Sequence, residues 1–256
     1  MKTINVKGLI IGEGRPRIVS PIIGKDDDDI VKRAMELASN PYVEILEWRS
    51  DKYNNSNDYE KIAIISKKLN EISKMKPLIF SFRTTCEGGD KNISTDEYVK
   101  LMEFVAQSTN FDIIDVDLLN KTGSERCIEI AHNTDKVVFG SYHDIYITPT
   151  KEDMVKKMTI MHELGADLVK MVVKANSPED TLTLLSATSE MNKRSKCPFA
   201  TMAMSNLGLI TRICGEVFGS SLTYGFVKKS SARGQIPVEK LNSVLNIIHK
   251  SVGEME

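Results

Sequence analysis

Short apolar runs alternate with longer amphipathic segments along almost the whole chain. In the longer segments, apolar residues recur at spacings of three and four, which is the period of a helix. Ile62, Ile65, Leu69 and Ile72, for example, fall on one helical face. The short runs are continuous and apolar, as expected for strands covered on both faces. This pattern predicts a series of strand–helix units.

Eight such units follow one another. Predicted strands cover residues 17–23, 42–48, 78–82, 111–116, 136–141, 167–173, 198–202 and 222–225. A predicted helix follows each strand, and these helices begin near residues 27, 58, 94, 124, 151, 177, 207 and 237. Strand starts lie about 29 residues apart, close to the length of a βαβ unit. Strict alternation favours a parallel sheet, and eight units favour an α/β fold of the (β/α)8 TIM-barrel type.

An open doubly wound sheet is the alternative architecture. It would place a glycine-rich phosphate-binding turn after the first strand, and residues 21–25 do not form one. Ahead of the first core strand, residues 3–11 and 15–23 are strand-like and are separated by Gly12-Glu13-Gly14. We expect an N-terminal β-hairpin there, which closes the bottom of the barrel. Without a linker or low-complexity tract, residues 1–256 are expected to form a single barrel domain.

Composition agrees with this fold and excludes some functions. The chain has 256 residues, 41% hydrophobic and 27% charged, as in an ordinary globular protein. Its net charge is −1 with no long basic tract, which argues against nucleic acid or a membrane surface as the main partner. No secretory signal and no membrane-length apolar run is visible, so a cytoplasmic location is expected. The 4 cysteines are widely spaced and are interpreted as free thiols rather than zinc ligands or disulfides.

Candidate chemistry begins with Lys170, which stands inside the apolar run 168–173. Lysine is almost never fully buried unless it is paired or used. Burial disfavours the ammonium form, so a buried lysine more readily becomes a neutral nucleophile that can form a Schiff base. The alternative is a lysine near a strand end whose ammonium group reaches solvent.

His143 is the one histidine of the 4 that ends a predicted strand. It shares a strand face with Val137, Phe139 and Ser141, on the strand before the one that carries Lys170. Imidazole titrates near neutrality and suits acid–base work beside an amine nucleophile. A structural loop histidine is the competing interpretation.

Three arginines are expected at the same end of the barrel, where the strands run into the following loops: Arg49, Arg83 and Arg212. Arginine binds carboxylates through a bidentate fork, so these residues indicate an anionic or hydroxyl-rich substrate. Each arginine taken alone is more often an ion-pair partner. Glu47 and Glu87 could supply those partners, or could orient His143.

Six short motifs occur in a specific order and spacing. They are Glu47-Trp48-Arg49-Ser50-Asp51, Phe82-Arg83 with Glu87-Gly88-Gly89, Ser141-Tyr142-His143-Asp144 with Thr148-Pro149, Gly165-Ala166-Asp167-Leu168-Val169-Lys170, Met202-Ala203-Met204, and Ser231-Ala232-Arg233-Gly234-Gln235-Ile236. With these motifs the sequence resembles the type I 3-dehydroquinate dehydratases of the shikimate pathway, over nearly the whole chain.

The resemblance implies roles for matching positions. Lys170 would form an imine with the substrate 3-dehydroquinate, His143 would be the acid–base group, and Glu87 would support His143. The implied substrate-binding set is Ser20, Glu47, Arg49, Arg83, Arg212, Ser231 and Gln235, with Arg212 as the carboxylate clamp. The implied pocket lining is Met202, Met204, Tyr224 and Ala232.

The reaction implied is a syn dehydration to 3-dehydroshikimate without metal or organic cofactor, because the lysine supplies the electron sink. The resemblance also implies a homodimer, and a loop over residues 225–237 that closes on the substrate. A few positions depart from the family pattern, and none of them removes a named catalytic group. They are Asp117, Lys174-Ala175, Ser205 and Arg233.

Two other functions remain compatible with a barrel lysine. A class I aldolase also uses an imine, but it would usually carry a phosphate site after its last strands, and residues 201–208 and 224–234 do not clearly provide one. A non-catalytic sensor of a sugar acid or quinate would not need both Lys170 and His143.

Overall fold

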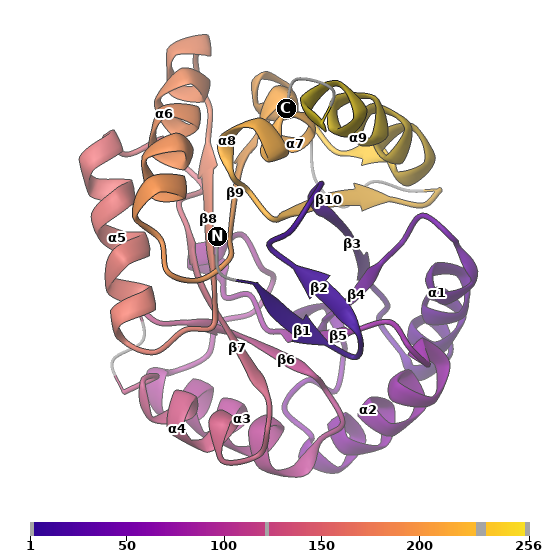
Figure 1. Cartoon of the computed structure of the whole chain (residues 1–256). Coiled ribbons are helices and arrows are strands. Elements are labelled where there is room, and N and C mark those ends of the chain that lie inside the picture. The colour runs from indigo at the N-terminus through magenta and orange to yellow at the C-terminus, as the bar shows by residue number, and fades with distance from the viewer. Residues whose placement is uncertain (1–2, 121–122, 229–233, 254–256) are drawn as a thin grey trace.

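Parallel strands curl around a common axis, and helices lie on their outer side (Figure 1). The computed structural model describes residues 3–120, 123–228 and 234–253. The eight barrel strands are β3 (Arg17–Ile22), β4 (Ile45–Arg49), β5 (Leu78–Ser81), β6 (Ile113–Asp117), β7 (Val137–His143), β8 (Leu168–Lys174), β9 (Phe199–Met204) and β10 (Leu222–Phe226). They pair in chain order, and β10 pairs in parallel with β3, so the predicted barrel is confirmed.

The barrel closes between β9 and β10 by isolated contacts rather than by a strand ladder among the described residues. The Ser221 amide donates to the Phe199 carbonyl at 2.7 Å, and the Thr201 amide donates to Ser220 Oγ at 3.1 Å. A short strand, β11 (Ile236–Pro237), pairs in parallel with the end of β10.

The helices are α1 (Asp27–Ser39), α2 (Tyr59–Ser73), α3 (Thr95–Ser108), α4 (Arg126–His132), α5 (Lys151–Glu163), α6 (Pro178–Arg194), α7 (Leu209–Ile213), α8 (Gly215–Phe218) and α9 (Val238–Gly253). At the start of α3, Ser94 and Glu97 form the capping box that the sequence predicts. The single helix predicted over 207–218 is wrong: Cys214, with φ −94° and ψ 13°, separates α7 from α8. None of the helices in the described ranges is long and apolar enough to cross a membrane.

The N-terminal hairpin is present, but its turn is not where the sequence analysis expected it. β1 (Ile4–Val6) pairs with β2 (Leu9–Ile11), and the turn falls at Lys7 and Gly8 instead of at residues 12–14. Lys7 and Gly8 have φ of 51° and 83°. Positive φ at both positions gives a two-residue turn whose twist matches that of the flanking strands. Val6 and Ile11 pack against the lower end of the barrel interior, which the hairpin covers (Figure 1).

Side chains of each strand alternate between the barrel interior and the helices outside. On β8, Leu168 and Val172 face the interior cluster, whereas Val169, Met171 and Val173 pack under the helices. The lower interior is filled by apolar side chains from successive strands: Val19, Ile45, Ile79, Ile113, Phe139, Leu168 and Leu222. Burying one such side chain contributes about 1.5–3 kcal/mol. This packed floor leaves space for a site only toward the carboxyl ends of the strands.

Candidate active site

A cavity of about 160 Å³ opens at the carboxyl ends of the barrel strands. Most of the residues that the sequence analysis selected line this one space: Glu47, Arg49, Arg83, Glu87, His143, Lys170, Met202, Met204, Arg212, Tyr224 and Gln235. They come from strands and loops along the whole chain, so the barrel brings together side chains that are far apart in sequence.

Three of the selected residues are not described at this cavity. Ser20 is fully buried, and its hydroxyl donates to the Gly225 carbonyl at 3.1 Å rather than lining the space. Ser231 and Ala232 lie outside the described residues. The predicted closing loop 225–237 also includes residues 229–233, which lie outside the described part of the chain.

Lys170 does not reach solvent. Its side chain is 3% exposed, and Nζ lies 4.8 Å from the Phe139 ring centroid and 5.5 Å from that of Tyr224. Burial and the nearby Arg83 guanidinium lower the pKa of the Lys170 amine. The interpretation as a solvent-reaching lysine near a strand end is therefore wrong.

Asp115 is the direct partner of Lys170, and the sequence analysis missed it. This carboxylate is fully buried on β6, and its Oδ2 lies 2.5 Å from Lys170 Nζ. Ser141 Oγ donates to Asp115 Oδ1 at 2.6 Å. The pKa of Asp115 lies far below its ordinary value, because the charges of Arg83 and Lys170 outweigh the cost of burying the carboxylate. Asp115 therefore stays ionised between two cations.

Arg83 forms the other half of this charge network. Its guanidinium is 3% exposed and binds Asp115 in a bidentate manner, with Nη1 at 2.7 Å from Oδ1 and Nη2 on Oδ2. Nη1 also lies 3.0 Å from Ser141 Oγ and 3.2 Å from Glu87 Oε1. One guanidinium thus connects the end of β5 with β6, with β7 and with the loop that carries Glu87.

Glu87 lies between Arg83 and His143 and is fixed by the local backbone. A one-turn 3-10 helix, η2 (Thr85–Glu87), turns it back so that the Thr84 amide and hydroxyl donate to its Oε2 at 3.1 and 3.0 Å. His143 Nδ1 lies 3.4 Å from Glu87 Oε1, a long contact. Burial opposes ionisation of Glu87, but His143 and Arg83 outweigh it and lower its pKa to about 2.

The imidazole of His143 is held in its neutral form. Burial and the Arg83 charge lower the pKa of His143 to about 3, although Glu87 opposes the shift. Near neutral pH the imidazole can therefore accept a proton, as a general base must.

Asp117 is the last residue of β6, and its carboxyl group is close enough to Glu87 for the two charges to interact. Its Oδ1 accepts from Asn120, whereas Oδ2 is buried without a hydrogen-bond partner among the described residues. Burial and the neighbouring Glu87 charge raise the pKa of Asp117 to about 6. Two carboxyl groups thus lie close to one another near His143, and Asp117 takes up a proton at a higher pH than Glu87 does.

Arg49 and Arg212 differ in their charge balance. Arg49 forms two hydrogen bonds of 2.8 Å with the fully buried Asp51, so its charge is matched. Arg212 is 3% exposed, and its hydrogen bonds among the described residues reach only Met202 Sδ at 3.6 Å and the Ala203 carbonyl at 3.4 Å. Burial lowers the pKa of Arg212 to about 10. A buried cation without a carboxylate partner in the described part of the chain favours an anionic ligand.

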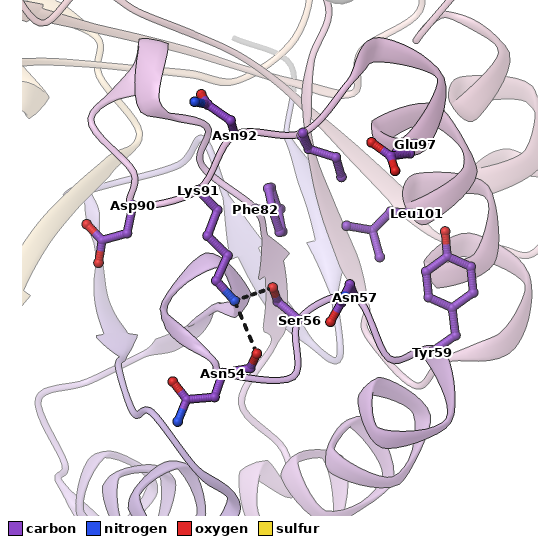
Figure 2. Close-up of a pocket in the computed structure, with 11 residues that line it drawn as sticks. Asn54, Ser56, Asn57, Tyr59, Phe82, Asp90, Lys91, Asn92, Glu97 and Leu101 are labelled. Carbon is purple, nitrogen blue, oxygen red and sulfur yellow. Dashed lines mark hydrogen bonds between the residues drawn. The ribbon is translucent and has the colours of Figure 1, made fainter.

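A larger cavity of about 630 Å³ lies outside this site, between the loop after β4 and residues 82–101 (Figure 2). Its charged groups are already bonded within the chain. Lys91 donates to Ser56 Oγ at 2.6 Å, and Asp90 pairs with Lys52 at 2.5 Å. None of the predicted site residues lines it. Its volume alone does not make it the site of chemistry.

No group of three or more His, Cys, Asp or Glu side chains in the described ranges could hold a metal ion. The cavity at the strand ends instead combines a buried amine, a neutral imidazole and an unmatched guanidinium. Together, the fold and this cavity define a (β/α)8-barrel enzyme whose reactive groups lie at the carboxyl ends of the strands.

Comparisons with known proteins identify the family. The model for type I 3-dehydroquinase matches residues 18–252. The 3-dehydroquinate dehydratase of Clostridioides difficile strain 630 is 42% identical over 253 residues, which cover 98% of this chain and 99% of that protein. The 3-dehydroquinate dehydratase of Clostridium novyi is 38% identical over 97% of this chain and 99% of that protein. The chain belongs to the type I 3-dehydroquinase family.

Solved structures agree with this assignment. A crystal structure of the Clostridium difficile type I enzyme with covalently modified comenic acid has a TM-score of 0.92 and 43% identity, covering 98% of this chain and 99% of that one. The 3-dehydroquinate dehydratase of Geobacillus kaustophilus has a TM-score of 0.93 and 33% identity, with 97% of each chain covered.

Proposed function

We propose that this protein is a hydro-lyase that dehydrates 3-dehydroquinate to 3-dehydroshikimate, the third step of the shikimate pathway, through an imine on Lys170. The observation that carries the proposal is the buried Lys170 amine, which shares one cavity with the neutral His143 and the unmatched Arg212. Membership of the type I 3-dehydroquinase family supports the same reaction.

Arg212 holds the substrate carboxylate in this proposal. Its guanidinium is buried without a carboxylate partner among the described residues, so the anionic substrate supplies the missing charge. Gln235 lines the same cavity and is suited to bind ring hydroxyls. These contacts orient the ring so that its ketone faces Lys170.

The first chemical step is attack of the Lys170 amine on the C3 ketone. The hydroxyl of the resulting carbinolamine takes up the proton that Lys170 gave up before its attack and leaves as water. The iminium ion that remains is positively charged, which makes the C2 proton much easier to remove. Asp115, 2.5 Å from Nζ, remains ionised and stabilises the cationic nitrogen before and after the imine forms. It does not act as a base, because its pKa is far too low.

His143 performs the proton transfers that follow. As a neutral imidazole it takes the C2 proton and gives an enamine. The imidazolium then protonates the C1 hydroxyl as it leaves, which requires that the proton and the hydroxyl depart from one face. Glu87, 3.4 Å from Nδ1, stabilises the imidazolium while it exists. Hydrolysis of the product imine restores Lys170.

Enone absorbance tests the reaction directly. Purified protein mixed with 3-dehydroquinate and no added metal should produce a rise in ultraviolet absorbance, because dehydration conjugates the ketone with a new double bond. Mass spectrometry of the small molecules should show the loss of one water. An unchanged absorbance, or fragments from carbon–carbon cleavage as an aldolase would give, would count against the proposed reaction.

We further propose that the chain forms a homodimer through an apolar surface near the start of α6. Tyr146, Leu182 and Leu207 are 70%, 65% and 44% exposed. Hydrogen bonds of Asn176 to the Tyr146 carbonyl and of Thr181 to the Leu207 carbonyl bring their segments together. Exposed apolar patches of this kind mark interaction sites.

Light scattering tests the assembly. The wild-type protein should have twice the mass of one chain, and Leu182→Lys should shift it toward the single-chain mass. Ile64→Lys on α2, where the side chain is 53% exposed, is the matched control and should leave the dimer intact. A wild-type protein with the mass of one chain would refute the dimer. The single-domain organisation and the cytoplasmic location stay predictions.

A further inference from the structure

Three buried polar atoms on the wall of the active-site cavity lack a hydrogen-bond partner among the described residues. They are His143 Nδ1, Arg212 Nε and the hydroxyl of Tyr224. Buried polar groups are nearly always hydrogen-bonded, because leaving one unpaired destabilises the folded protein. His143 Nδ1 faces Glu87 Oε1 at 3.4 Å, and in the proposed function Arg212 binds the substrate carboxylate. Neither contact supplies a partner for the Tyr224 hydroxyl.

Tyr224 is part of the barrel interior. It lies on β10 in the same inward-facing cluster as Leu222 and Met202, and it is 7% exposed. Its ring centroid lies 5.5 Å from Lys170 Nζ. A phenylalanine would provide the same ring against Lys170 and the same packing, so these contacts do not require the hydroxyl.

Other buried tyrosines show what a structural hydroxyl does in this protein. The Tyr53 hydroxyl donates to Asp27 Oδ1 at 2.6 Å, and the Tyr98 hydroxyl accepts from the Asp117 amide at 2.9 Å. Both join separate segments of the barrel. The Tyr224 hydroxyl joins nothing in the described ranges, and Tyr224 lines the cavity, so a bound ligand is in a position to supply the partner.

The groups around Tyr224 determine how its hydroxyl acts. Burial, together with the charges of Glu47 and Asp115, raises the pKa of Tyr224 well above its ordinary value, against the opposing effect of Arg83 and Arg49. The phenol is therefore protonated throughout the reaction and can donate to an acceptor. Tyr224 and Arg212 line the same cavity.

We propose that Tyr224 is a specificity-determining residue whose hydroxyl donates a hydrogen bond to an oxygen of the ring bound in this cavity. This inference rests on the proposed function. A substrate with a hydroxyl or carboxylate oxygen at that point satisfies the phenol. A ring that lacks the oxygen leaves the donor unpaired, and a site built to hydrogen-bond a substrate rejects such a ring strongly.

Tyr224→Phe tests the proposal, because it removes only the hydroxyl. We expect KM for 3-dehydroquinate to rise by about 3- to 10-fold, the effect of losing one neutral hydrogen bond. We also expect the melting temperature without substrate to rise by about 2–4 °C, because an unpaired buried hydroxyl has been removed. A higher melting temperature together with a higher KM is not expected if the Tyr224 hydroxyl has only a packing role.

Tyr53→Phe is the matched control. Its hydroxyl is bonded to Asp27, so the substitution should lower the melting temperature and leave KM unchanged. If Tyr224→Phe leaves KM unchanged, or lowers the melting temperature as Tyr53→Phe does, the proposal is wrong although the dehydratase activity stands. If the wild-type protein does not turn over 3-dehydroquinate, the proposed function fails and this inference fails with it.

Discussion

Replacing Lys170 with alanine is expected to abolish turnover and to remove the adduct that borohydride traps from wild-type protein and 3-dehydroquinate. Without the amine no iminium forms, so the C2 proton stays weakly acidic. The rate should fall by about 10³-fold or more, as when a covalent nucleophile is removed. Mass spectrometry of the trapped protein should locate the reduced adduct on Lys170 in the wild type and find no adduct in the variant.

Two variants make this experiment specific. Lys136→Ala removes a half-buried lysine at the other end of β7, where Nζ donates to the Thr109 carbonyl at 2.9 Å, and should leave both the adduct and turnover intact. His143→Ala should still give the adduct but stall at proton removal. An adduct of equal yield in Lys170→Ala, or normal turnover in that variant, would contradict the imine mechanism.

Asp115→Asn is expected to cost both stability and activity, because it removes the anion that lies closest to both Arg83 and Lys170. Breaking a buried ion pair on one side typically destabilises a protein by about 3–5 kcal/mol. Turnover should fall by about 10²- to 10³-fold, since the cationic nitrogen loses its counter-ion and Arg83 its bidentate partner. Urea denaturation and steady-state kinetics measure the two effects.

The stability loss should depend on pH in a defined direction. The pKa of Asp115 is far lower in the folded protein than in the unfolded chain, where it is about 3.9. The stability that ionised Asp115 contributes is therefore fully present above about pH 4–5 and decreases as the pH falls further. The gap between wild type and Asp115→Asn should be constant from pH 8 to pH 5 and narrow below pH 4.

Ser141→Ala provides the matched control for Asp115→Asn. It removes the hydroxyl that donates to Asp115 at 2.6 Å and accepts from Arg83 Nη1 at 3.0 Å, and it leaves the charges in place. We expect it to cost about 1.5–3 kcal/mol, the range for hydrogen bonds to charged groups, without the same loss of turnover. If Asp115→Asn were no worse than Ser141→Ala in stability and in turnover, the carboxylate would not have the electrostatic role proposed for it.

Much of this fold follows from periodicity in the sequence. The parallel strands of a barrel are buried on both faces, so they leave continuous apolar runs, and each helix leaves a stripe such as Ile62, Ile65 and Leu69. The hairpin turn was placed wrongly because glycines at 12 and 14 suggested a turn more strongly than Lys7-Gly8, where a lysine adopts a positive φ. A backbone bend at Cys214 leaves no signal in the apolar pattern, so the break between α7 and α8 was missed.

The site was predictable in part for a related reason. Lys170 is recognisable in the sequence because it lies inside an apolar run. His143 is recognisable because it ends a predicted strand. The partner of Lys170, Asp115, lies in the middle of β6 rather than at a strand end, where the reactive groups of a barrel are expected. Ile113 and Asp115 share one strand face, so Asp115 is a charged residue inside an apolar run, as Lys170 is. The hydrogen bond of Ser20 to Gly225 joins the first and last barrel strands, a contact that no local pattern reveals.

The network around Arg83 has a consequence for how the molecule opens. Arg83, Asp115, Ser141 and Lys170 tie four consecutive strands together through charges that water does not reach. Local unfolding of any one strand would expose unpaired ions, so β5 to β8 should exchange their amide hydrogens as one cooperative unit. Among the described residues, β9 and β10 on the opposite wall meet without a ladder, and the hydrogen bonds of Arg212 reach only Met202 and Ala203. We therefore expect the proposed catalytic residues to lie on the sector of the barrel that is best protected against hydrogen exchange, and the proposed carboxylate-binding Arg212 on a sector that opens more easily.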